Sequence, residues 1–251
     1  MDLGRPLLEI CVEDGHGIDA AFAGGADRIE LCSALALGGL TPPAALVARA
    51  VASGLPVHAM VRPRAGDFVY SPQEILLMAE EIACLRALGV SGVVVGATHV
   101  DGRPDQAALG TLRDAAQGLE IVLHRAVDLA PDPVAAVAIA ADLGFDHVLS
   151  SGGEANASMG AAMLAAMVGE AKGRLKIIAG AGVRPDNVVA LLAASGVDAV
   201  HASAAREQDW PDARVCRLGF AVGPRRQTSR EFVAALAEKV GACRRPHNDR
   251  T

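Results

Sequence analysis

The sequence has no uninterrupted apolar run approaching the ~18 residues needed to cross a bilayer. Its first residues, MDLGRPLLEICVEDGHG, contain no basic head followed by a long apolar stretch, which is the pattern of a secretory leader. We therefore expect a protein of the cytoplasm that has no membrane partner.

Cysteine is sparse, and charge of one sign is not concentrated anywhere. The five cysteines are an odd number, lie far apart and include no CxxC pair, so we expect reduced thiols rather than disulfides or a structural zinc site. The formal net charge of -6 comes from mixed-sign residues, without the basic stripe of a nucleic-acid-binding protein. Arg225, Arg226, Arg244 and Arg245 are expected to form a solvated tail or helix flank. Nucleic acid is not an expected partner, and no pattern indicates an organic cofactor.

The sequence also lacks linkers and low-complexity segments, which indicates a single domain over residues 1–251. Short apolar runs alternate with longer amphipathic stretches, as in repeated strand and helix units. The short runs begin at Leu7, Arg28, Val57, Gly92, Glu120, His147, Lys176 and Ala199. Because about eight such units close a parallel barrel, the sequence predicts an α/β protein with a TIM-type (β/α)8 barrel over about 7–204.

Helix start and stop signals support this interpretation. The stretch SPQEILLMAEEIACLRALG begins with Ser71 as N-cap and Pro72 at the first helical position, and it ends at Gly89. After residue 204 the alternation of strand and helix patterns stops, and residues 205–228 show no regular hydrophobic periodicity. We expect an extended segment there, either a loop at the barrel mouth or an oligomer contact, before a closing helix completes 205–251.

Polar side chains recur on one face of the first two expected strands. Alternation puts Glu9 and Cys11 together in LLEIC, and Glu30 and Cys32 together in RIELC. The apolar faces should contact the helices, so these four side chains should point into the barrel. We expect the two thiols at matching height near the C-terminal ends of the strands, where barrel active sites lie.

Further ionisable residues join this face from other strands. Arg62 is expected between the two glutamates, where it would offset the free energy needed to bury them. His124 is expected beside them, with Asp128 orienting it or serving as a further acid, and His201 shares the interior face of the last strand. Neighbouring carboxylates raise one pKa, which suits acid and base chemistry. The alternative is a satisfied structural network, and His58, lower in its strand, fits a hydrogen-bonded core histidine better.

Two glycine stretches follow the sixth and seventh expected strands. SSGGEA contains Ser151 and Gly152, and AGAGVRPDNV contains Gly180 and Gly182 and runs into a helix. Backbone amides of such loops bind anions, and the late loops of a barrel commonly bind phosphate. The stretches predict an anion site, although glycines also permit close packing of strands and helices.

The two thiols suggest a different function. If the sulfurs of Cys11 and Cys32 approach one another, with a thioether from Met60, they would favour Cu(I) over hard cations. Free cysteine is also a common small core residue, so the pair equally fits simple packing.

At these residues the sequence resembles a known family. The blocks LLEICVED, GADRIELCSALALGGLTP, HAMVRPRAGDFVYS, LHRAVD, LSSGG, AGAGVRPDNV and VHASA are similar, in order, to those of the CutC copper homeostasis proteins over Leu7 to Ala204. The resemblance implies a TIM-type barrel, a cytoplasmic location, a homodimer or larger homo-oligomer, and a role in copper tolerance. It implies Cu(I) ligands at Cys11 and Cys32, and a polar interior at Glu9, Glu30, Arg62, His124, Asp128 and His201.

Two hypotheses follow. The first, which the resemblance favours, is copper homeostasis with Cu(I) bound by the two thiols. The second is a barrel enzyme, a lyase, isomerase or hydrolase, that performs acid and base chemistry on a small sugar, polyol or phosphorylated metabolite. Whether the chain is an enzyme is left open by the residues alone.

Overall fold

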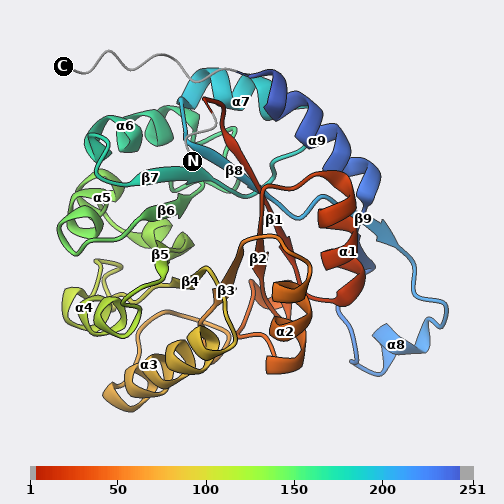
Figure 1. Cartoon of the computed structure of the whole chain (residues 1–251), viewed down its shortest axis with the longest axis horizontal. Coiled ribbons are helices and arrows are strands. Elements are labelled where there is room, and N and C mark those ends of the chain that lie inside the picture. The colour runs from red at the N-terminus through yellow and green to blue at the C-terminus, as the bar shows by residue number, and fades with distance from the viewer. Residues whose placement is uncertain (1–3, 244–251) are drawn as a thin grey trace.

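The computed structural model describes residues 4–243 and contains a closed parallel barrel (Figure 1). Each strand pairs with its sequence neighbours, and β8 closes on β1. The strands are β1 (Leu7–Val12), β2 (Arg28–Leu31), β3 (Val57–Met60), β4 (Gly92–Val95), β5 (Glu120–Leu123), β6 (His147–Ser150), β7 (Lys176–Ala179) and β8 (Ala199–Ala202). The predicted TIM-type barrel and all eight strands are confirmed. The expected domain ends, including Arg244 and Arg245, lie outside the described residues.

Helices surround the barrel, as Figure 1 shows. They are α1 (Gly15–Gly24), α2 (Ala44–Ala52), α3 (Pro72–Ala87), α4 (Gln106–Ala115), α5 (Pro133–Asp142), α6 (Ala161–Ala171), α7 (Val188–Ser195) and α9 (Arg230–Ala242). Ser71 caps α3 in a capping box with Glu74, as its sequence predicts. Short 3-10 helices, η1 (Leu35–Leu37) and η2 (Arg125–Leu129), follow β2 and β5. In the part of the chain that the structure describes, no helix is long and apolar enough to cross a membrane.

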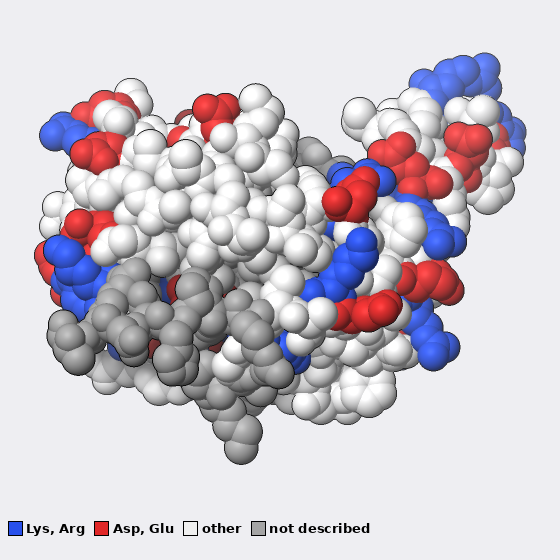
Figure 2. Space-filling model, turned by 90° about the horizontal axis from the view of Figure 1, so that it is seen from above, with Lys and Arg blue, Asp and Glu red and all other residues white. Residues whose placement is uncertain are grey.

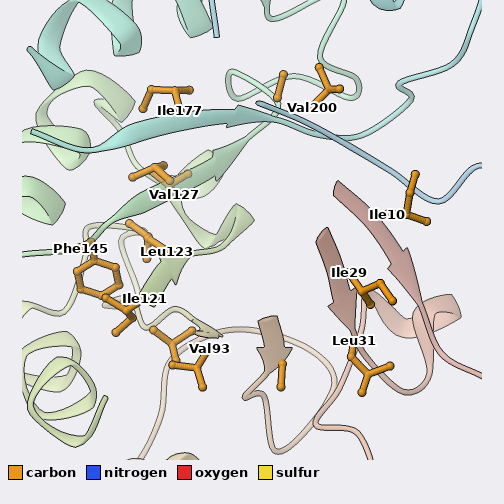
Figure 3. Packing of buried hydrophobic residues seen from close by; sticks show 14 of the residues in the cluster. Ile10, Ile29, Leu31, Val93, Ile121, Leu123, Val127, Phe145, Ile177 and Val200 are labelled. Carbon is orange, nitrogen blue, oxygen red and sulfur yellow. The ribbon is translucent and has the colours of Figure 1, made fainter. Parts of the chain in front are cut away.

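The apolar core has two parts separated by the strands. The larger part fills the space between strands and helices, where the outward side chains Ile10, Ile29, Val93, Ile121 and Ile177 are fully buried (Figure 3). Each such side chain contributes about 1.5–3 kcal/mol by leaving water. The smaller part is a ring inside the barrel, made of Cys32, Met60, Val94, Val122, Leu149, Ile178 and Ala199. Polar interior side chains lie toward each end of the strands, with Glu120, His58 and His147 at one end and Glu30 and His201 at the other.

Neighbouring strands are staggered rather than level. Cys11 of β1 lies beside Glu30 of β2, and Glu9 lies beside Arg28. A closed barrel requires this shift, because its strands tilt against the axis. The stagger decides which interior side chains meet.

The segment after β8 is more ordered than a loop. Strands β9 (Ala205–Gln208) and β10 (Arg225–Thr228) pair antiparallel and carry between them the short helix α8 (Arg214–Arg217). This ribbon projects beside the barrel in Figure 1, and α9 then packs against α1 and α7. The face in Figure 2 has large uncharged areas, with acidic and basic side chains mixed at its edges.

A glycine at the end of β4 generates a stability prediction. A Cβ at Gly96 would overlap the His124 ring, whereas one at Gly169, an exposed position in α6, would meet nothing within 4 Å. We expect Gly96→Ala to lower the free energy of unfolding by about 1–3 kcal/mol through overpacking. The control Gly169→Ala should raise it by about 0.5–1 kcal/mol. Urea denaturation of both variants measures the effect, and equal stability of the two would contradict the predicted packing.

Candidate functional site

A cavity of about 420 Å³ lies at the C-terminal ends of the barrel strands. That volume suits a small ligand. Its inner wall contains seven side chains from the barrel interior, Cys11, Glu30, Met60, Arg62, His124, Leu149 and His201. The other large side chains that line it are Phe68, Phe232, Leu35, Leu37 and three further arginines, Arg125, Arg184 and Arg226. The site therefore combines acid and base groups with several cations.

Glu9 lies one step below the cavity and is fixed by two partners. Arg28 Nε donates to Glu9 Oε2 at 2.6 Å, and His201 Nδ1 lies 2.7 Å from Glu9 Oε1. Burial would raise the pKa of Glu9, but Arg28 and His201 outweigh burial and hold that pKa well below its usual range. Glu9 is therefore a permanent negative charge that orients the His201 ring.

Glu30 is the second buried carboxyl group, and one of its oxygens has no partner. Cys32 Sγ donates a long hydrogen bond to Glu30 Oε1 at 3.5 Å. Oε2 is buried without a hydrogen bond, and it lies 3.9 Å from His201 Nδ1. Burial, reinforced by Glu9, raises the pKa of Glu30 against the opposing charge of His201. Glu30 therefore keeps its proton to a higher pH than an ordinary carboxyl group.

His201 stands between the two carboxyl groups. The pairing of β1 with β8 places it directly beside Glu9. Burial would lower the pKa of His201, but its acidic neighbours Cys11, Glu30 and Glu9 raise it well above its ordinary value. The imidazole therefore keeps its proton to a higher pH than an ordinary histidine does.

The thiols do not lie at matching height, which corrects the sequence-based expectation. Because of the strand stagger, Cys11 lies beside Glu30, and Cys32 is two residues further toward the mouth. Cys11 lines the cavity, whereas Cys32 is fully buried in the inner ring. Burial raises the pKa of Cys32 well above its ordinary value, and Glu30 and Cys11 add to the effect.

Arg62 does not lie between the two glutamates, so that expectation is wrong. Its guanidinium donates to the carbonyl oxygens of Leu37, Gly39 and Gly66 at 2.8–3.0 Å. It also lies over the Phe68 ring, 5.0 Å from the centroid. The positive charge that was expected beside the glutamates comes instead from Arg28 of β2, which contacts Glu9. Arg62 instead holds two loops at the cavity wall, with its buried Nε unpartnered.

His124 enters the cavity wall as a neutral ring. Its Nδ1 accepts a hydrogen bond from the Ala126 amide at 3.1 Å, so Nε2 carries the proton. Burial and the Arg62 charge lower the pKa of His124 to about 3. Nε2 is buried and has no partner in the described part of the chain. His124 thus offers an unused hydrogen-bond donor at neutral pH.

Asp128 does not orient His124, contrary to expectation. Its carboxylate accepts hydrogen bonds from the Ser150 hydroxyl at 2.6 Å, from Ser151 through its amide and hydroxyl at 3.1 and 2.9 Å, and from the Gly153 amide at 3.2 Å. Arg125 Nε completes the set at 2.8 Å. The anion that the SSGG loop binds is therefore an internal carboxylate.

The expected anion-binding residues differ in their access to the cavity. The Ser151 amide is occupied by Asp128, and the Gly152 amide donates to the Ser150 hydroxyl at 2.8 Å. Gly180 makes room for the Leu149 side chain, 2.7 Å from where a Cβ would stand. Gly182 lines the cavity in a left-handed conformation with φ 70°. Of these four residues, only Gly182 reaches the cavity.

A second polar cluster occupies the opposite end of the barrel. Glu120 Oε2 lies 3.0 Å from His58 Nε2 and 3.1 Å from His147 Nε2, and Arg28 Nη1 lies 3.6 Å away. Hydrogen bonds to His147 and His58 hold the pKa of Glu120 well below its usual range. Burial lowers the pKa of His58. None of these four residues lines the cavity, so His58 belongs to the core network rather than to the cavity.

Sequence reasoning missed several residues of the site. Arg28 shares the interior parity of Glu30 in RIELC, and that signal could have identified it. Arg226, expected to be a solvated flank, lines the cavity from β10, as Arg184 does from the loop after β7. Whether these two arginines reach the cavity depends on how the segments after β7 and β8 fold over the barrel, which strand periodicity does not predict.

The chain is similar to proteins of one family along most of its length. A family model described as the CutC family matches residues 6–206. A CutC family protein of Agrobacterium fabrum is 48% identical over 237 residues, 94% of each chain, and one of Caulobacter vibrioides is 44% identical over 246 residues, 97% of this chain and 99% of its own. The crystal structure of a proposed copper homeostasis protein CutC from Streptococcus agalactiae is 30% identical, with a TM-score of 0.75, and covers 79% of this chain and 98% of its own.

The buried ion pair generates a stability prediction. Replacing Arg28 with Met leaves Glu9 buried without its main counter-charge, so we expect Arg28→Met to lower the free energy of unfolding by about 3–5 kcal/mol at pH 7. The control Arg49→Met breaks the exposed pair with Asp19 and should change it by at most about 1 kcal/mol.

The effect of Arg28→Met should depend on pH with a defined sign. Because the pKa of Glu9 is lowered by folding, its contribution is complete above the unfolded carboxyl pKa of about 4.3 and is lost as pH falls toward the folded value. The difference between wild type and variant should therefore be smaller at pH 3 than at pH 7. Denaturant titrations at both pH values measure it, and a difference that grows on acidification would contradict the assigned pair.

Proposed function

We propose that this chain, which belongs to the CutC family, binds a small anionic metabolite at the barrel mouth and catalyses proton transfer on it. One observation carries the proposal: a buried carboxyl group with a free oxygen, Glu30, lies 3.9 Å from the imidazole of His201 in the wall of a ligand-sized cavity. Ionisable groups whose pKa values are shifted by burial and by one another within one cleft are typical of acid and base catalysis.

The charges around the cavity support an anionic ligand. Four arginines line it, and among the residues 4–243 that line it Glu30 is the only one with a carboxyl group. Arg62 is held in place by three carbonyl oxygens, so its guanidinium is already oriented before a ligand arrives. Arg184 and Arg226 are exposed and would add charge at the entrance. A carboxylate or phosphate group is the chemistry that arginines recognise.

The inner wall supports movement of a proton. Glu30 and His201 both keep protons to higher pH than usual, so either could donate one to a bound ligand and recover it later. His124 stays neutral and could donate its Nε2 hydrogen bond to an oxygen that becomes negative. These roles match isomerisation or elimination beside a carbonyl group better than they match hydrolysis.

The proposed reaction can be tested with a metabolite screen. Phosphorylated and carboxylated sugars and polyols that raise the melting temperature would be incubated in D2O, with exchange of their carbon-bound protons followed by NMR. We expect Glu30→Gln to slow exchange by about 10²–10⁴-fold, the usual contribution of a general acid or base. The control Glu81→Gln removes a half-buried carboxylate on α3, outside the cavity, and should leave the rate unchanged. Exchange that survives Glu30→Gln and His201→Ala would refute the proposal.

A second candidate function is Cu(I) binding. It is supported by the family, by Cys11 and Met60 in the cavity wall and by Cys32, which packs with Met60 in the inner ring. It is weakened by the stagger of the thiols and by the raised pKa of Cys32, because Cu(I) needs the thiolate.

A competitive Cu(I) titration of the reduced protein tests this candidate. Copper handling predicts about one tightly bound Cu(I) per chain, which the double variant Cys11→Ser, Cys32→Ser loses. Cys84→Ser, an exposed position in α3, is the matched control and should bind as the wild type does. Binding that is weak, or equal in the double variant, would exclude a site at these thiols.

A further inference from the structure

Two carboxyl groups and an imidazole converge at the base of the cavity. One ligand atom from each of Glu9, Glu30 and His201 lies within 4.8 Å of the others. The side chains come from three strands that are adjacent in the closed sheet, β2, β1 and β8. Their positions are thus set by the barrel rather than by a mobile loop.

The distances within this group fit a shared cation. Ligand atoms about 2.1 Å from one ion lie about 3.0–3.4 Å apart in octahedral or tetrahedral geometry. The two distances from His201 Nδ1, 2.7 Å to Glu9 Oε1 and 3.9 Å to Glu30 Oε2, lie on either side of that range. Both distances are within about 0.5 Å of that range, and all three ligand atoms lie within 4.8 Å of one another.

A second observation points to a missing partner. Glu30 Oε2 is buried and makes no hydrogen bond within residues 4–243, although Glu30 is only 3% exposed. A buried carboxylate oxygen without a partner is unfavourable by about 1–3 kcal/mol, so native proteins normally satisfy it. A cation between Glu30, Glu9 and His201 would satisfy this oxygen directly.

The surroundings match those of metal ligands in other proteins. Arg28 holds the far oxygen of Glu9 at 2.6 Å, so the near oxygen, Oε1, is oriented toward the group. Glu30 and His201 also line the cavity, so an ion there would have coordination positions facing a ligand. Such open positions are typical of catalytic rather than structural metal sites.

We propose that Glu9, Glu30 and His201 form a binding site for a divalent first-row cation such as Mn²⁺ at the base of the cavity. Two carboxylates and one imidazole are hard or borderline ligands, which suit Mn²⁺ or Fe²⁺ and not Cu(I). The site is separate from the thiol site considered above, because it needs neither Cys11 nor Cys32. Bound there, the cation would face the anionic group of a metabolite and would replace the protons of Glu30 and His201, so the proton transfer proposed above belongs to the metal-free protein.

The proposal does not depend on the proposed reaction, because the cation can be measured without a metabolite. Chelator-treated protein would be titrated with Mn²⁺ and the free ion counted by EPR, while pulsed EPR detects an imidazole nitrogen bound to the ion. We expect about one Mn²⁺ per chain with a nitrogen coupling. Glu30→Gln, which keeps the side-chain shape, and His201→Ala should each weaken binding by at least ~100-fold, because loss of a ligand exceeds the 10–100-fold effect of its supporting residues.

Two controls separate this site from other sources of binding. Glu81→Gln is a matched change outside the barrel, and Cys84→Ser removes an exposed thiol of α3; both should bind Mn²⁺ as the wild type does. Circular dichroism and melting temperature establish that each variant is folded. Absence of millimolar or tighter binding by the wild type, absence of a nitrogen coupling, or equal binding by folded Glu30→Gln would overturn the proposal. Exchange activity without Mn²⁺ binding would overturn this site and leave the proposed function standing.

Discussion

The burial of Glu9 inside the barrel is the constraint on which the rest of the interior depends. A carboxylate that is 1% exposed is stable only when both oxygens are compensated, and here Arg28 and His201 occupy one each. Arg28 in turn approaches Glu120 at the lower end, and His201 approaches Glu30 at the mouth. Through these two partners, Glu9 connects the polar cluster at the lower end of the barrel with the one at the mouth.

The stagger between strands gives the two ends of the barrel different polar contacts. The lower cluster pairs one carboxylate with Arg28 and two histidines, so its charges are compensated within the protein. Buried polar atoms without hydrogen-bond partners occur at both ends, in Glu30, Arg62 and His124 at the mouth and in Arg28, His58 and His147 at the lower end. Unpaired buried polar atoms lower stability, and proteins tolerate them mainly at functional sites. The three residues at the mouth line the ligand-sized cavity, so a ligand there would complete their hydrogen bonding.

The fold could be predicted from the sequence because its signals are local. Strand alternation identified Glu9, Glu30 and His201 as interior residues, and cap and glycine signals bounded α3. The partners could not be predicted, because they depend on the register between strands. A stagger of two residues moved Cys32 away from Cys11 and placed Arg28, rather than Arg62, beside Glu9. Asp128 was captured by the SSGG loop, an interaction between segments that no periodicity describes.

A measurement of the charge of His201 tests the proposed proton chemistry most directly. Side-chain 15N NMR of metal-free protein distinguishes a charged imidazole from each neutral tautomer, and loss of the signal in His201→Ala assigns it. The account predicts that His201 is an imidazolium at pH 7 and titrates only well above its ordinary pKa, while His124 is neutral with its proton on Nε2. A neutral His201 at pH 7 would contradict the assigned pairing with Glu9 and Glu30, and with it the proton chemistry proposed for the mouth.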